Sequence, residues 1–179
     1  MKRLLIFALL LSGCSFLKKT QSQFYSLEVI KPAAVTAPRG AASVPIGIDG
    51  VELPPGLDRR EIVARGADHR LELRGTNQWA APLEDMVIHT LAFDLANRLP
   101  EGMVVLPGQA KPQAMRPIYI VFEDLAAGQD NTFVLDARWT LDGVTRHERI
   151  PVQLASLETA EIVAGMSRAL AELADRIAA

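Results

Sequence analysis

FVLDARWTLDGVTRHERIPV, residues 133–152, predicts two β-strands joined by a tight turn. Apolar side chains alternate along the first strand, and Asp142-Gly143 is typical of a two-residue hairpin turn. A regular turn places Leu141 opposite Val144 and Asp136 opposite Arg149, a favourable cross-strand pair. Trp139 then faces Arg146, Leu135 faces Ile150, and Phe133 faces Val152.

One position in this hairpin conflicts with the pattern. Glu148 would lie opposite Ala137 on the apolar side of the sheet. Either that end of the sheet is uncovered, or a bulge resets the pairing. Pro151 cannot donate a ladder hydrogen bond, so we expect the last strand to lie at a sheet edge.

Further strands are predicted upstream by alternating or β-branched runs. A strand at Ile118–Glu123 precedes turn residues at 128–131 and would extend the hairpin. The others are expected at Phe24–Val29, Ser43–Val51, Ile62–Arg65, Arg70–Arg74 and Met103–Leu106. The third and fourth are separated by a short polar turn, which predicts a hairpin.

Two helices are predicted from apolar stripes of helical period. Pro82 opens the first helix, and Pro100 ends it. Ser156 is a candidate cap for the second. Their stripes are Leu83, Val87, Leu91, Leu95 and Leu99, and Ile162, Met166, Leu170, Leu173 and Ile177. The sequence therefore predicts an α+β fold: a mainly antiparallel β-sheet with two α-helices packed on one face, as a single domain.

The N-terminus predicts export. Lys2 and Arg3 precede a short apolar run that ends at Leu11-Ser12-Gly13-Cys14, as in a lipoprotein signal. We expect residues 1–13 to be a lipoprotein signal peptide, 14–23 a lipidated tether and 24–179 the folded domain. Cys14 is the chain's one cysteine, so no disulfide competes for it. An ordinary signal peptide with an incidental cysteine is the alternative.

The net charge of the chain limits the classes of partner that it is expected to bind. The whole chain has a formal charge of −2, which becomes −4 without Lys2 and Arg3. This argues against nucleic acid and against general attraction to anionic headgroups. Membrane attachment would then depend on acyl chains at Cys14. Ser15, in place of a retaining Asp, favours the outer membrane, with the domain in the periplasm.

No catalytic pattern is evident. The histidines, His69, His89 and His147, lack the spacing of a helical metal site. The sequence contains no nucleophile elbow and no phosphate-binding loop. We therefore expect no enzyme activity, no metal and no cofactor beyond the covalent acyl chains on Cys14.

Two segments have the composition of a binding surface. Leu53–Arg65 is rich in Pro, Gly and Arg, and Gln78–Leu83 places Trp79 just before a helix. Trp and Arg are common anchors at protein interfaces. The alternative is structural: Trp79 packs over the helix start, and Arg59 ties its loop to an acidic neighbour.

These segments, in their order, resemble the ABC-type transport auxiliary lipoprotein family, the PqiC-like proteins. The residues that carry the resemblance are Phe24-Tyr25-Ser26-Leu27, Leu53-Pro54-Pro55-Gly56-Leu57-Asp58-Arg59, Ile62-Val63-Ala64-Arg65, Trp79-Ala80-Ala81-Pro82-Leu83 and Leu135-Asp136-Ala137-Arg138-Trp139. The resemblance covers nearly all of the chain that follows the signal.

The resemblance implies a docking role without catalysis. Such lipoproteins accompany an MCE-domain protein, with a permease and an ATPase in some systems, that moves lipids or other hydrophobic solutes between two membranes. The hypothesis for partner binding is Leu57, Asp58, Arg59, Arg65, Trp79 and Pro82. Alternatives are a stand-alone lipid-binding lipoprotein and an envelope-stabilising scaffold. A homo-oligomer would suit an oligomeric MCE partner.

Overall fold

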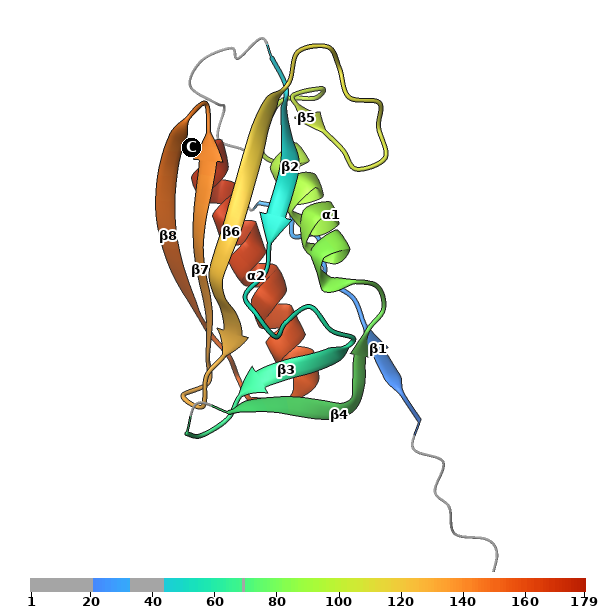
Figure 1. Ribbon diagram of the computed structural model, residues 1–179, viewed down its shortest axis with the longest axis vertical. Coiled ribbons are helices and arrows are strands. Elements are labelled where there is room, and N and C mark those ends of the chain that lie inside the picture. The colour runs from blue at the N-terminus through green and yellow to red at the C-terminus, as the bar shows by residue number, and fades with distance from the viewer. Residues whose placement is uncertain (1–20, 33–43, 69) are drawn as a thin grey trace, which may run out of the picture.

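Three antiparallel strands form the centre of the structure, a computed structural model that describes residues 21–32, 44–68 and 70–179 (Figure 1). They are β6 (Arg116–Ala127), β7 (Thr132–Leu141) and β8 (Val144–Gln153). The expected signal peptide, Cys14, Ser43 and His69 lie outside the described residues.

The β7–β8 hairpin has the predicted register. Leu141 pairs with Val144, and Asp136 pairs with Arg149. Both turn residues have positive φ, 52° at Asp142 and 75° at Gly143. This is the left-handed geometry of a type I′ turn, whose twist matches that of the strands. β8 is an edge strand, as Pro151 predicted.

Glu148 does pair with Ala137, and the β7–β8 ladder is continuous. Its carboxylate lies 3.7 Å from Arg176 near the end of the second helix, so a basic side chain covers this margin of the sheet. The bulge lies instead in β6, where the register shifts between Phe122 and Asp124. Neither an uncovered sheet end nor a bulge at this position accounts for Glu148. Its carboxylate is instead paired with Arg176.

β6 also has a parallel neighbour. β2 (Ile46–Glu52) runs parallel to β6, and β5 (Val104–Val105) runs parallel to β2. The order of this five-stranded sheet is β5-β2-β6-β7-β8. Parallel neighbours need a long crossover, and here the chain makes it through the second sheet and a helix. The α+β class is confirmed, with mixed sheets instead of one antiparallel sheet.

The remaining strands form a separate three-stranded sheet, β1-β4-β3. β1 (Gln23–Tyr25) is shorter than the predicted Phe24–Val29, and it runs parallel to the end of β4. β3 (Glu61–Arg65) and β4 (Leu71–Trp79) form the predicted hairpin. β4 extends well past Arg74 because Gly75, at φ 60°, permits the strand to bend and continue.

Both helices cover one face of the five-stranded sheet (Figure 1). α1 (Leu83–Ala96) packs on β2 and β5, and α2 (Thr159–Ala178) packs on β7 and β8. The predicted stripes are buried, except that Leu99 lies beyond the end of α1 and is partly buried. Neither described helix has the length and apolar character needed to cross a membrane.

The predicted cap of the second helix is wrong by two residues. Glu158 occupies the N-cap position, and its backbone N–H donates to the hydroxyl of Ser156 at 3.3 Å. Ser156 therefore stabilises the turn that leads into α2.

Candidate functional site

Three segments converge where β4 ends and α1 begins. The Trp79 N–H donates to the carbonyl of Arg60 at 2.7 Å, and the Ala80 N–H donates to the carbonyl of Tyr25 at 2.9 Å. The loop before β3 and the end of β1 are thus fixed on either side of the β4 terminus. Backbone bonds of this kind fix position independently of side-chain identity.

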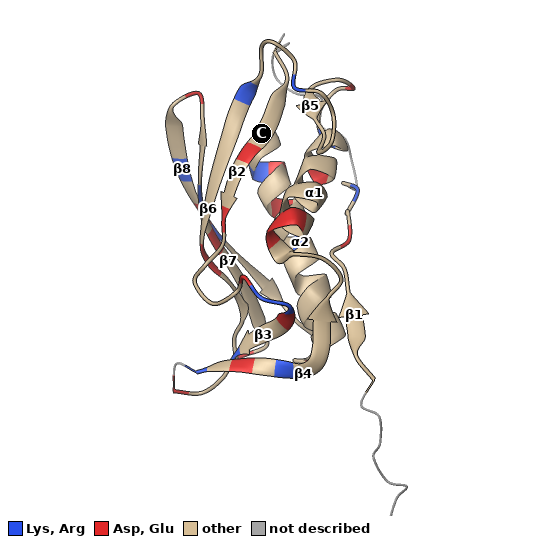
Figure 2. Ribbon diagram, turned by 45° about the vertical axis from the view of Figure 1, so that its right-hand side comes forward, with Lys and Arg blue, Asp and Glu red and all other residues tan. Residues whose placement is uncertain are grey.

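A surface hollow of about 430 Å³ lies at this junction. Its lining is charged on one wall and apolar on the other, and consists of Asp58, Arg59, Arg60, Trp79, Ala80, Ala81 and Pro82. We call it the 58–82 hollow. Figure 2 shows the basic residues of the loop before β3 beside this end of β4. The structure thus brings the Asp58-Arg59 loop beside Trp79 and Pro82.

The six predicted residues do not have equal exposure. Asp58, Arg59 and Pro82 are exposed at the hollow. Leu57 and Trp79 are only 7% and 4% exposed and belong to the core. Trp79 therefore lies in the core beneath the hollow and presents little of itself to solvent. Its burial favours the structural alternative, in which Trp79 has a packing role, over a directly exposed anchor.

Arg59 makes a local ion pair. Its Nε lies 3.4 Å from a carboxylate oxygen of Glu61, and both side chains are substantially exposed. Exposed pairs of this kind contribute little to stability, typically below about 1 kcal/mol. Arg59 can therefore exchange Glu61 for a partner's acidic group at low cost.

Arg65 lies away from the hollow, at the other end of β3. Its guanidinium pairs with Asp124 of β6 at 2.5 Å and so joins the two sheets. Asp124 is nearly buried, and its cross-strand neighbour is another nearly buried carboxylate, Asp136. Arg65 thus offsets the repulsion between the carboxylates of Asp124 and Asp136. Its role in the structure is therefore to stabilise the domain.

Three residues that line the hollow, Arg60, Ala80 and Ala81, were not among the six predicted partner-binding residues. Arg60 supplies both a charged wall and the carbonyl that fixes Trp79, and Ala80 is held by β1. The pairing of Arg59 with Arg60 in a loop was the available signal. The role of β1 depends on a parallel contact between distant segments, which the local pattern does not encode.

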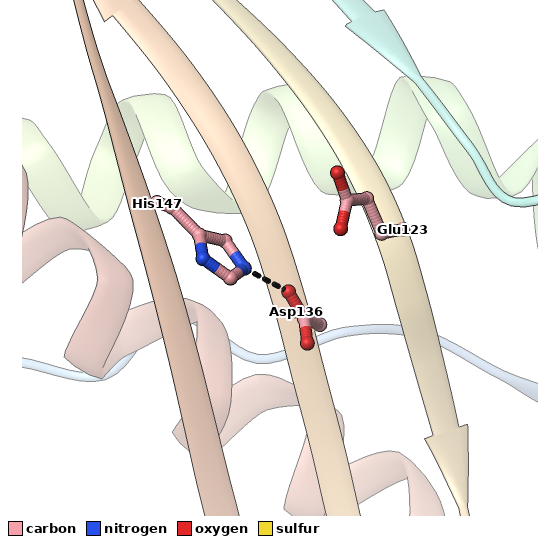
Figure 3. A group of neighbouring side chains, drawn as sticks. All are labelled: Glu123, Asp136 and His147. Atoms are coloured by element: carbon pink, nitrogen blue, oxygen red, sulfur yellow. Dashed lines mark hydrogen bonds and ion pairs between the residues drawn. The ribbon is translucent and has the colours of Figure 1, made fainter.

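A second cluster lies on the sheet face opposite the helices. Glu123, Asp136 and His147 each offer a ligand atom, and these atoms lie within 4.8 Å of one another (Figure 3). Glu123 already accepts from Arg138 at 2.5 Å, and Asp136 accepts from His147 at 2.5 Å and Arg149 at 2.6 Å. A divalent ion would have to displace both guanidiniums. We therefore assign the cluster to the stability of the sheet.

The ionisation of Asp136 fits this assignment. Burial raises the pKa of Asp136, but hydrogen bonds from His147 and Arg149 outweigh it and hold the pKa below its ordinary value. The carboxylate is therefore ionised and paired at neutral pH. It acts as a fixed charge between two strands, which is not the state of a general acid.

The whole domain matches one known family model, that of the ABC-type transport auxiliary lipoprotein component, over residues 25–178. The chain belongs to this family. It is 26% identical over 167 residues to the intermembrane transport lipoprotein PqiC of Escherichia coli (strain K12), an alignment that covers 93% of this chain and 87% of the relative. The PqiC of Shigella flexneri matches to the same extent.

Solved structures show the same fold. An uncharacterized protein superimposes with a TM-score of 0.71 at 18% identity, over 88% of this chain and 96% of the other. A protein of Xanthomonas campestris gives a TM-score of 0.62 at 16% identity, over 88% and 93%. The α+β architecture is therefore one found in other proteins.

Membership of the ABC-type transport auxiliary lipoprotein family confirms the resemblance inferred from the motifs. The chain is an auxiliary lipoprotein of a transport system. The convergence at the 58–82 hollow includes three of the motif segments that carried the resemblance: the one containing Tyr25, the one ending in Arg59 and the one beginning with Trp79.

Proposed function

We propose that this auxiliary lipoprotein is held on the periplasmic face of the outer membrane by acyl chains on Cys14. There it serves a system of the MCE/ABC type that moves lipids or other hydrophobic solutes between two membranes. Its relatives are named intermembrane transport lipoproteins, which supports a role between membranes. Its contribution is docking, without catalysis and without a cofactor beyond the acyl chains.

The observation that carries the docking role is the 58–82 hollow. Its exposed rim has both charges, and its floor is a buried tryptophan held by backbone hydrogen bonds. A rigid, concave, amphipathic surface suits a protruding side chain of a protein partner with charged neighbours. The partner proposed is the periplasmic part of an MCE-domain protein, which works with its permease and ATPase.

Several copies of the chain could surround an oligomeric MCE partner. Most homo-oligomers have closed point-group symmetry, and a closed ring of copies would suit an oligomeric partner. A homo-oligomer is therefore part of the proposal, and the mass of the purified complex tests it.

The test is recovery of the partner from gently solubilised membranes with a tagged chain, followed by mass spectrometry. We expect an MCE-domain protein with the wild type and a loss of at least tenfold with Arg59→Glu and Arg60→Glu combined. The control is Arg176→Glu, because Arg176 is likewise an exposed arginine with a neighbouring carboxylate. Trp79→Ala is unsuitable, since truncating a buried tryptophan costs about 3–5 kcal/mol of stability.

The outcomes separate the alternatives. Equal recovery with the double variant and the control would show that docking lies elsewhere on the molecule. Recovery of a stoichiometric lipid and no protein, in conditions that preserve other envelope complexes, would favour a stand-alone lipid-binding lipoprotein. Membrane fractionation of wild type and Cys14→Ser tests the anchor separately, because the variant should lose membrane attachment.

A further inference from the structure

Three of the six large hydrophobic side chains that remain exposed among the described residues lie on the small three-stranded sheet: Phe24 at 60%, Leu71 at 47% and Leu73 at 50%. The other three, Tyr119, Val121 and Val144, lie on the larger five-stranded sheet. Phe24 lies on β1, and the two leucines lie on β4. The smaller sheet thus exposes as many large apolar side chains as the larger one does, which makes it a candidate contact surface.

These strands lie together at one end of the molecule. Figures 1 and 2 place β1, β3 and β4 at the end from which α1 and α2 begin, and the β7–β8 turn lies at the opposite end. α2 has 20 residues, so it extends about 30 Å away from this end. Phe24, Leu71 and Leu73 therefore lie toward one end of the molecule, and exposed Val144, next to the β7–β8 turn, lies toward the other.

The same end receives the N-terminal part of the chain. From Cys14 to Gln23 the chain reaches at most about 30 Å even when fully extended. If Cys14 carries acyl chains, as the proposed function holds, β1 must lie within that distance of the lipid headgroups. The three-stranded sheet is then the part of the described structure with the shortest connection to the membrane.

The charges at this end are compatible with a lipid surface. Outside the 58–82 hollow, residues 61–74 contain three arginines and three acidic residues, so this part of the chain has no net charge to repel anionic headgroups. Figure 2 shows basic positions along β4. Arginine side chains beside exposed apolar groups can lay their stems on an apolar surface and direct their charge to the headgroups.

We propose that Phe24, Leu71 and Leu73 contact the headgroup region of the membrane that carries the acyl anchor. The inference rests on the proposed lipidation of Cys14 and adds an orientation: the three-stranded sheet faces the lipid, and the β7–β8 turn faces away. Because the acyl anchor holds the domain at the membrane, this contact is intramolecular. It can therefore form even when its intrinsic affinity is too low to bind the free domain to the membrane. The acyl chains supply attachment, and these side chains set the orientation.

The orientation can be measured in the intact lipidated protein. Cys14 is the chain's one cysteine, and acylation blocks its thiol, so a single introduced cysteine accepts a fluorescent label selectively. Phe24→Cys and Leu73→Cys place labels on the three-stranded sheet. Val144→Cys is the matched control, because Val144 is apolar, 58% exposed and follows the distant β7–β8 turn.

The labelled proteins are reconstituted in vesicles of phosphatidylethanolamine and phosphatidylglycerol with brominated acyl chains. We expect at least threefold stronger quenching by the brominated lipid at positions 24 and 73 than at 144. Equal quenching at all three positions, or stronger quenching at 144, would overturn the orientation. Protection of positions 24 and 73 from aqueous iodide without quenching by lipid would also overturn it, and would indicate a protein covering the sheet.

Flotation of the same vesicles separates this inference from the proposed function. A wild-type chain that does not float has no acyl anchor, and the proposed attachment and this orientation then fail together. A chain that floats but shows no preferential quenching retains the anchor and loses only the orientation. Partner recovery through the 58–82 hollow is scored independently of both results.

Discussion

Arg98, in the turn that follows α1, donates two hydrogen bonds to Asp175 of α2, at 2.6 and 3.3 Å. The same guanidinium donates to the carbonyl of Ile30 at 3.1 Å and to that of Asp94 at 2.9 Å. Arg98 is almost fully buried. The side chain of Arg98 therefore joins both helices to the segment that follows β1. This segment lies near the N-terminal tether that leads to the proposed anchor.

Replacing Arg98 with Met should lower the free energy of unfolding by about 3 kcal/mol, because it leaves buried acceptors without a donor. Arg59→Met is the control: Arg59 pairs with Glu61 in solvent, and its replacement should cost less than about 1 kcal/mol. Urea unfolding of both variants at pH 7 measures the difference. Similar losses would mean that the Arg98 contacts contribute no more than a surface pair.

Asp94 should make stability fall as pH rises. Burial, above all, raises its pKa from 3.8 to about 6, against the opposing effects of the Ile30 N–H and the charge of Arg98. Its Oδ2 is buried without a hydrogen-bond partner. Between these two pKa values the unfolded chain has lost the proton that the folded chain keeps, so stability declines over this range and the full penalty is present above pH 6.

Asp94→Asn should remove that penalty while keeping an acceptor for Ile30. The stability of the variant relative to wild type should increase by about 2 kcal/mol between pH 4 and pH 7. Urea titrations at several pH values give this difference directly, and the other carboxylates cancel because they are present in both proteins. Parallel pH profiles would show that Asp94 titrates normally.

The hairpin and both helices could be predicted because their signals are local. Asp142-Gly143 specifies the turn, and the turn specifies the register of every pair as far as Phe133 with Val152. The bend in β4 was missed because Gly75 normally weakens a strand, whereas here its positive φ lets the strand continue.

The candidate site was only partly predictable. The motifs identified Asp58 and Arg59, but exposure depends on tertiary packing, and Trp79 is a core residue. The Arg98 network was missed because its partners come from three separate segments. Asp94 carried one local signal: it lies three residues after Leu91, on the buried side of α1.

Substitutions of Arg65 and Arg59 should differ in their effect on the stability of the protein, although both were predicted partner-binding residues. Arg65→Ala leaves nearly buried Asp124 opposite Asp136 and should cost about 1–3 kcal/mol. Arg59→Ala breaks only an exposed pair with Glu61 and should cost about 0.5 kcal/mol or less.

A second substitution tests the cause of the Arg65 effect. Asp124→Asn in the Arg65→Ala background should restore much of the lost stability, because it removes the charge left without a partner. Thermal unfolding of the single and double variants measures the coupling. Simple additivity of the two changes would argue that Arg65 acts through packing and not through its charge.

Gly143 gives a graded test of the turn. Its φ is 75°, and a Cβ added there would meet nothing within 4 Å, so backbone conformation alone should set the cost of substitution. Gly143→Ala should cost about 1–2 kcal/mol of stability. Gly143→Asn should cost less, because Asn tolerates the left-handed region, and Gly143→Val should cost the most. Urea unfolding of the three variants gives the order. Equal losses for Asn and Val would mean that a contact, and not φ, limits this position, and the assignment of the type I′ turn would then fail.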